Sequence, residues 1–103
     1  MSIMKSDGAE GSLPIQILID QRCQKLGLRR SELARRCGYK RVPKGIRRLD
    51  ELCAGDLQRT KFLLAGLPSA LELSSDVVNR ALTDTAQRLD ERATRAAVEA
   101  EPA

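Results

Sequence analysis

Apolar residues recur every three or four positions through most of the chain, which is the spacing of one face of an α-helix. This pattern predicts five helices, at about residues 13–26, 31–37, 43–54, 56–73 and 75–89. Gly27, Gly38 and Gly55 directly follow the first three segments, where glycine commonly ends a helix. Pro14 and Pro43 fall in first turns, where a missing N–H costs little. Pro68 should kink or restart the fourth helix.

The inward face of each helix follows from a rotation of 100° per residue. In the third helix, Lys44, Arg48 and Glu51 are expected opposite the core, with Arg47 at the shoulder. Short polar residues before the apolar runs predict N-caps at Ser12, at Ser31 and at Ser74 or Ser75. The expected core residues are Ile15, Leu18, Ile19, Leu26, Leu33, Ala34, Cys37, Ile46, Leu49, Cys53, Phe62, Leu63, Leu67, Ala70, Leu71, Val77, Val78, Ala81, Leu82, Ala86 and Leu89.

Composition agrees with an all-α fold. Aromatic residues make up only 2% of the 103 residues, so the core must be built from aliphatic side chains, which favours packed helices over sheets. We therefore predict a compact bundle of about five short helices formed by residues 13–92. Residues 1–12 are expected to form a disordered leader and residues 93–103 a flexible tail. No secretory signal or membrane-spanning run is seen, so a cytoplasmic location is expected.

Enzyme chemistry is not expected. The chain has no histidine, which removes the commonest general base and a common zinc ligand. Cys23, Cys37 and Cys53 are too widely spaced for a zinc motif and are expected to be small buried thiols. Acid–base or metal chemistry at the carboxylates of Asp50, Glu51 and Asp56 is disfavoured for lack of such partners. We expect no catalytic residue, metal, cofactor or small-molecule ligand.

Positive charge is concentrated in the middle of the chain. Residues 22–48 hold eleven basic residues and one acidic residue, a net charge of +10. The rest of the chain holds seven basic and thirteen acidic residues, a net charge of −6. Such a polarised chain should present one strongly positive face, which is typical of nucleic-acid-binding proteins.

The stretch SELARRCGY…VPKGIRRLDEL resembles the helix-turn-helix of phage-repressor-like (Cro/repressor, lambda-repressor-like) domains. Leu33 and Ala34 match the pair early in that family's second helix, and Gly38 matches the glycine that ends it. Ile46 and Leu49, followed by Asp50, match the inward residues and the acid of its recognition helix. The resemblance covers about residues 13–83, and the turn here is about two residues longer than usual.

The resemblance implies sequence-specific binding of double-stranded DNA by a small bacterial or phage transcriptional regulator. Lys44 and Arg48 would reach guanine edges in the major groove, and Arg47 a base or a phosphate. The remaining cations of the predicted DNA-binding set would contact phosphates. That full set is Arg29, Arg30, Arg35, Arg36, Lys40, Arg41, Lys44, Arg47 and Arg48.

Some alternatives stay open from the sequence. The same fold could be a protein-interaction module whose basic face binds an acidic partner, or an RNA-associated basic domain. The last helix could pack within the domain or contribute to a homodimer. An ion pair between Arg22 and Asp50 is expected by analogy with the Arg–acid pair that ties the corresponding helices of the family.

Overall fold

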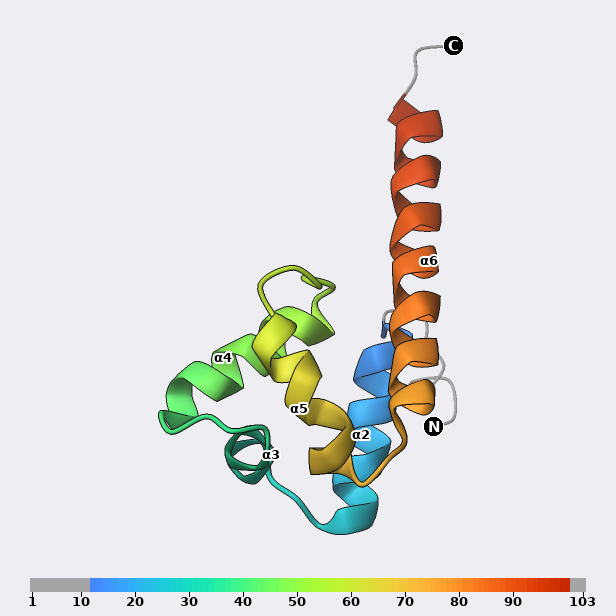
Figure 1. The fold of residues 1–103 in the computed structure, drawn as a ribbon. Helices are drawn as coiled ribbons and strands as arrows, with labels where there is room; N and C mark the ends of the chain where they lie inside the picture. Colours follow the sequence, from blue (N-terminus) through green and yellow to red (C-terminus); the bar gives the residue numbers. More distant parts are fainter. Residues whose placement is uncertain (1–11, 101–103) are drawn as a thin grey trace, which may run out of the picture.

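The structure is a computed structural model that describes residues 12–100, with side chains described as far as residue 95. The predicted leader at 1–12 therefore lies, except for Ser12, outside the described residues. The described residues form five helices, α2 (Pro14–Leu26), α3 (Arg30–Arg36), α4 (Val42–Cys53), α5 (Lys61–Leu71) and α6 (Ser75–Ala100), whose arrangement can be followed in Figure 1. The prediction of a small all-α bundle is confirmed, and the described residues contain no strand. None of these helices is long and apolar enough to span a bilayer.

The core is aliphatic, as the composition requires. Its fully buried large apolar side chains are leucines, isoleucines and one valine contributed by helices α2 to α6, and the hydroxyl-bearing Thr60 and Thr85 are buried with them. Three predicted core residues are instead exposed: Phe62 at 58%, Val77 at 43%, and Ala86. Phe62 and Val77 lie in the first turn of α5 and α6, and periodicity alone misplaced all three.

The helix ends agree with the sequence signals in part. Gly27, Gly38 and Gly55 follow α2, α3 and α4 with φ of 68°, 105° and 103°. The chain runs through Pro68 as one helix and does not restart there. Ser74 caps α6 as predicted, because its hydroxyl accepts a hydrogen bond of 3.4 Å from the Val77 amide.

Two predicted caps are wrong. Helix α3 begins at Arg30 rather than after Ser31, because the Glu32 carboxylate accepts a hydrogen bond of 3.0 Å from the Arg29 amide and fixes an earlier start. Helix α2 has Leu13 at its N-cap, a residue with no polar side chain, in place of Ser12. The missing cap comes from α6, where the buried Thr85 hydroxyl accepts from the Ile15 amide at 2.9 Å.

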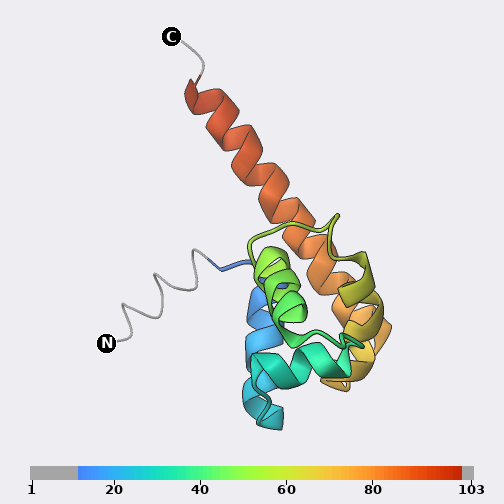
Figure 2. The same ribbon diagram turned by 90° about the vertical axis from the view of Figure 1, so that its left-hand side faces the viewer.

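Helix α6 packs against α2 with its first half and then leaves the body of the molecule. Leu89 is the last partly buried apolar side chain, and residues 90–95 are all exposed. The helix nevertheless continues to Ala100, so the segment predicted as a tail at 93–103 is helical as far as that residue. Figures 1 and 2 show this end of α6 projecting well beyond the other helices.

Helix α3 is held between α4 and α5 by two glycines. A Cβ atom placed on Gly45 of α4 would lie 2.6 Å from the Cβ of Ala34, a residue of α3 with no exposed surface. A Cβ atom placed on Gly66 of α5 would lie 2.7 Å from the backbone oxygen of Cys37. Real Cβ atoms do not approach other atoms this closely, so any larger residue at either position must move a helix.

The glycine contact yields the first prediction. Gly45→Ala should lower the free energy of unfolding by about 1–3 kcal/mol, the usual effect of overpacking a core. This is the opposite of what intrinsic helix propensity predicts, since alanine is favoured over glycine by about 1 kcal/mol inside a helix. Urea denaturation followed by circular dichroism measures the difference.

Adding Ala34→Gly to the Gly45→Ala variant is the matched control, because it removes the Cβ atom that the new methyl group meets. The double variant should lose less stability than the sum of the two single changes. Additive losses, or a stabilised Gly45→Ala protein, would show that this contact does not set the position of α4.

Candidate functional site

The outer face of α4 is centred on Arg47. On the inner face, Gly45, Leu49 and Leu52 are buried, whereas Ile46 and Cys53 are only partly so. The buried face of α4 is therefore rotated about the helix axis, by part of a turn, from the predicted face through Ile46, Leu49 and Cys53. The exposed residues of the helix are Pro43, Lys44, Arg47 and Asp50, followed by Ala54 after its end. Arg47, expected at the shoulder, is the residue that points most directly away from the core.

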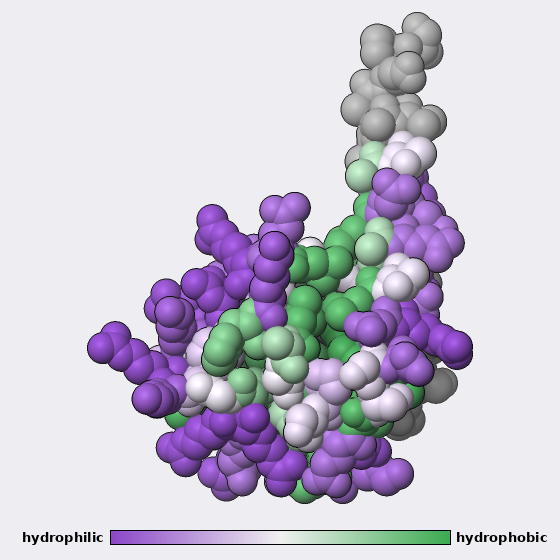
Figure 3. All heavy atoms as spheres, viewed as in Figure 1, coloured by the Kyte–Doolittle hydropathy of each residue, from purple (hydrophilic) through white to green (hydrophobic). Residues whose placement is uncertain are grey.

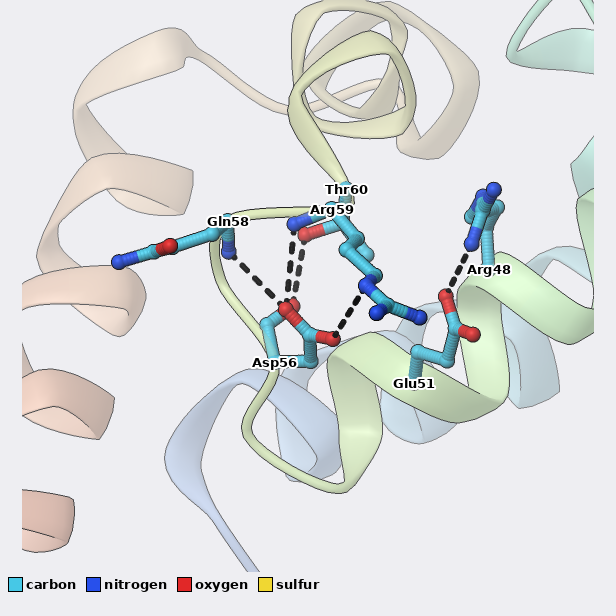
Figure 4. Close-up of polar contacts among 6 residues, drawn as sticks. All are labelled: Arg48, Glu51, Asp56, Gln58, Arg59 and Thr60. Atoms are coloured by element: carbon cyan, nitrogen blue, oxygen red, sulfur yellow. Dashed lines mark hydrogen bonds and ion pairs between the residues drawn. The ribbon is translucent and has the colours of Figure 1, made fainter.

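Arg48 and Glu51 lie on the flank of α4 rather than on its outer face. Their side chains are 26% and 25% exposed and form an ion pair of 2.7 Å. This pair faces the loop between α4 and α5 (Figure 4). Of the two residues expected to read bases, Lys44 is therefore exposed and unpaired within the described residues, and Arg48 is engaged by a neighbouring carboxylate.

Six of the nine predicted DNA-binding cations are free at the surface. The side chains of these six are exposed and make no hydrogen bond or ion pair with the described part of the chain. They are Arg29 at the N-cap of α3, Arg35 within α3, Lys40 and Arg41 in the turn, and Lys44 and Arg47 on α4. Figure 3 shows hydrophilic side chains projecting from this edge of the molecule, over α4 and the turn before it.

Arg30 holds helices together. Its guanidinium group contacts Asp20 of α2 at 3.2 Å and Asp50 of α4 at 3.4 Å, and Cys53 Sγ at 3.7 Å. Three helices thus meet at one partly buried guanidinium. The expected pair of Arg22 with Asp50 is wrong, because Asp50 pairs with Arg30, and Arg22 instead donates to the backbone oxygens of Leu71 and Glu72.

Arg22 and Arg36 together cap the C-terminus of α5. Arg22 donates to the backbone oxygens of Leu71 at 3.1 Å and Glu72 at 3.4 Å. Arg36 donates to the Ala70 oxygen at 3.2 Å and to the Glu72 carboxylate at 3.2 Å. The last carbonyls of a helix lack partners and carry partial negative charge, so two guanidinium groups stabilise them. The guanidinium group of Arg36 therefore has its partners within the domain and stabilises the fold.

A hollow lies beside α4, lined by five cations and both aromatic rings of the chain. Its volume is about 530 Å³, and its walls come from the turn, α4 and the start of α5. The ring of Phe62 stands against Tyr39 in an edge-to-face contact, with centroids 5.0 Å apart at 77°. The lining residues are Gly38, Tyr39, Lys40, Arg41, Lys44, Arg48, Arg59 and Phe62. The helical periodicity indicated neither Arg59 nor the hollow, since it placed Phe62 in the core.

Asp56 organises the loop that carries Arg59. Its carboxylate accepts hydrogen bonds from the amides of Gln58 at 3.2 Å and Arg59 at 3.1 Å. Its backbone oxygen accepts from the buried Thr60 hydroxyl at 2.9 Å. Figure 4 shows the resulting turn, with the Arg59 side chain reaching toward the Arg48–Glu51 pair. Asp56, considered above as an acid–base candidate, has a structural role here.

Burial disfavours the thiolate form of all three cysteines. Burial raises the pKa of Cys37 to about 11, and it also raises the pKa of Cys23 and Cys53 above the ordinary value. A nucleophilic or metal-binding cysteine needs the thiolate, which a raised pKa disfavours at neutral pH. Cys37 is buried as predicted, whereas Cys23 and Cys53 are partly exposed. Within the described residues no group of cysteines and carboxylates could hold a metal ion.

No protein-family model, curated protein or solved structure matches this chain.

The loop geometry gives the second prediction. Asp56→Ala removes the acceptor for two backbone amides and should lower the free energy of unfolding by about 1 kcal/mol, as loss of a comparable cap does. Asp56→Asn keeps a side-chain oxygen that can accept these hydrogen bonds, so its free energy of unfolding should stay much closer to that of the wild type. Thermal denaturation of both variants measures the difference, and equal losses would show that the charge of Asp56 matters rather than its two hydrogen bonds.

Proposed function

We propose that this domain binds double-stranded DNA, with α4 in the major groove and α3 bracing it across the backbone as a helix-turn-helix. The protein would act as a small transcriptional regulator in a bacterium or phage. The observation that carries the proposal is the set of free cations on α4 and the turn before it. Lys40, Arg41, Lys44 and Arg47 are exposed along one edge with no carboxylate partner in the described residues.

The shape of this edge supports the proposal. A helix about 10–12 Å wide fits the major groove, and the twelve residues of α4 span about 18 Å. Figure 1 places the N-terminal end of α4 at the border of the molecule on the side away from α6. Arg47 would be the first side chain to meet base edges, with Lys44 one turn before it.

The role proposed for each cation depends on whether it has a partner inside the domain. Lys40 and Arg41 in the turn would neutralise phosphates along the groove, together with Arg29 at the N-cap of α3 and Arg35 within α3. Arg30 and Arg36 would act indirectly, because their guanidinium groups join helices. Arg48 is held by Glu51, so breaking that ion pair would offset part of any contact it makes with DNA.

Binding measurements on duplexes test the proposal. A duplex selected from a random pool should bind with a logarithmic salt slope of about −0.9 for each phosphate neutralised. Lys44→Ala and Arg47→Ala should each weaken binding by about 1–3 kcal/mol and relax specificity at one position. Arg48→Ala should cost less than either, because Arg48 is already paired. Fluorescence anisotropy at several salt concentrations gives both the affinity and the slope.

Arg88→Ala is the matched control, since Arg88 is an exposed arginine on α6, remote from the proposed interface. It should leave affinity close to that of the wild type. The proposal would be refuted if the protein had no affinity for a duplex near physiological salt. It would also be refuted if Arg88→Ala lowered duplex affinity as much as Arg47→Ala does. Capture of an acidic protein without duplex affinity would instead favour the interaction-module alternative.

A further inference from the structure

Phe62 is not explained by duplex binding. It is one of two aromatic residues in the chain, and 58% of its surface is exposed at a hollow that five cations also line. A phenyl ring gains little from a phosphate backbone, and its exposure to water is unfavourable. Gly38 lies directly behind it, since a Cβ atom there would be 3.3 Å from Phe62 Cζ. The ring is therefore held in place with a free surface beside cations.

The hollow has more positive charge than the protein neutralises. Five of its lining residues are cationic. Arg48 pairs with Glu51 at 2.7 Å, and Arg59 lies 4.0 Å from Asp56. Lys40, Arg41 and Lys44 have no such partner in the described residues. Three unpaired cations around one space suit a phosphate monoester, which carries about −1.5 to −2 charges at neutral pH, better than a single carboxylate.

The size of the hollow is also suitable for a small ligand. Its volume of about 530 Å³ lies within the range of about 300–1,000 Å³ that is usual for small-molecule sites. A ligand that filled it would need a phosphate at the turn and α4, and a flat group at Phe62. Bases stack well on exposed aromatic rings and on arginine guanidinium groups.

We propose that this hollow binds a nucleoside monophosphate. The phosphate lies among Lys40, Arg41 and Lys44, and the base stacks on the exposed face of Phe62. The same chemical unit is available as a free nucleotide or as the 5′-phosphorylated end of a nucleic-acid strand. Because Lys44 belongs both to this hollow and to the outer face of α4, a bound nucleotide competes with a DNA duplex for that residue.

Proton NMR of the full chain tests this site directly. The chain has one phenylalanine, one tyrosine and no tryptophan, so the ring protons of Phe62 and Tyr39 are identified without ambiguity. Adenosine 5′-monophosphate should shift the Phe62 ring protons upfield in a saturable way, because a stacked base shields them. Inorganic phosphate should displace the nucleotide, and adenosine should bind at least about tenfold more weakly.

Matched variants separate the two halves of the ligand. Phe62→Leu should weaken nucleotide binding while leaving inorganic phosphate unaffected, and Phe62→Tyr should retain both. Lys40→Gln with Arg41→Gln should weaken nucleotide and phosphate alike. Val77→Ala changes another large exposed apolar side chain, the only such one besides Phe62 among the described residues, and should have no effect. A 5′-phosphorylated single strand that binds more tightly than the mononucleotide would identify a strand end as the source, and weaker binding would identify the free nucleotide.

The proposal is overturned if millimolar nucleotide produces no saturable shift. It is also overturned if adenosine binds as well as its monophosphate, or if the Lys40 and Arg41 changes leave nucleotide affinity unaltered. These results are independent of the DNA proposal. A protein that binds duplex but no nucleotide contradicts only this inference, and one that binds nucleotide but no duplex contradicts only the proposed function.

Discussion

The close approach of α3 to its two neighbours sets the geometry of the rest of the domain. Ala34 fits against Gly45 of α4, and the backbone of Cys37 fits against Gly66 of α5. Because these contacts leave no room for a Cβ atom, α3 sits at a fixed depth between the two helices. The turn that follows it then brings Lys40 and Arg41 to the end of α4, and Gly38 to the ring of Phe62. The positive edge and the hollow are thus both products of one packing constraint.

Arginines perform two separate tasks in this protein. Arg22, Arg30 and Arg36 use their charge inside the domain, where they cap the end of α5 or join α2, α3 and α4. The cations of the turn and of the outer face of α4 have no such engagement in the described residues. A high arginine content therefore stabilises a small bundle that is poor in aromatic residues, and still leaves a free positive surface.

The sequence was sufficient to locate the helices but not to orient all of them. Periodicity and glycine positions identified all five helices, because both signals are local. The rotation of α4 was missed because its buried line runs through Gly45, and glycine gives no hydropathy signal. The cap of α2 was missed because the capping hydroxyl belongs to Thr85, which lies seventy positions along the chain from Ile15. Counting charges identified the basic surface. It could not show that Arg30 is engaged by carboxylates while Lys44 is not, since the partners of Arg30 are Asp20 and Asp50, which are distant in the sequence.

The central claim is that the outer face of α4 and the turn before it form the DNA-contacting surface. Backbone amide shifts of the ¹⁵N-labelled protein, recorded while a selected duplex is added, test it most directly. The account predicts that the largest changes fall within residues 38–48, with small changes at 76–95 in α6. Changes centred on α6, with residues 38–48 unmoved, would contradict it.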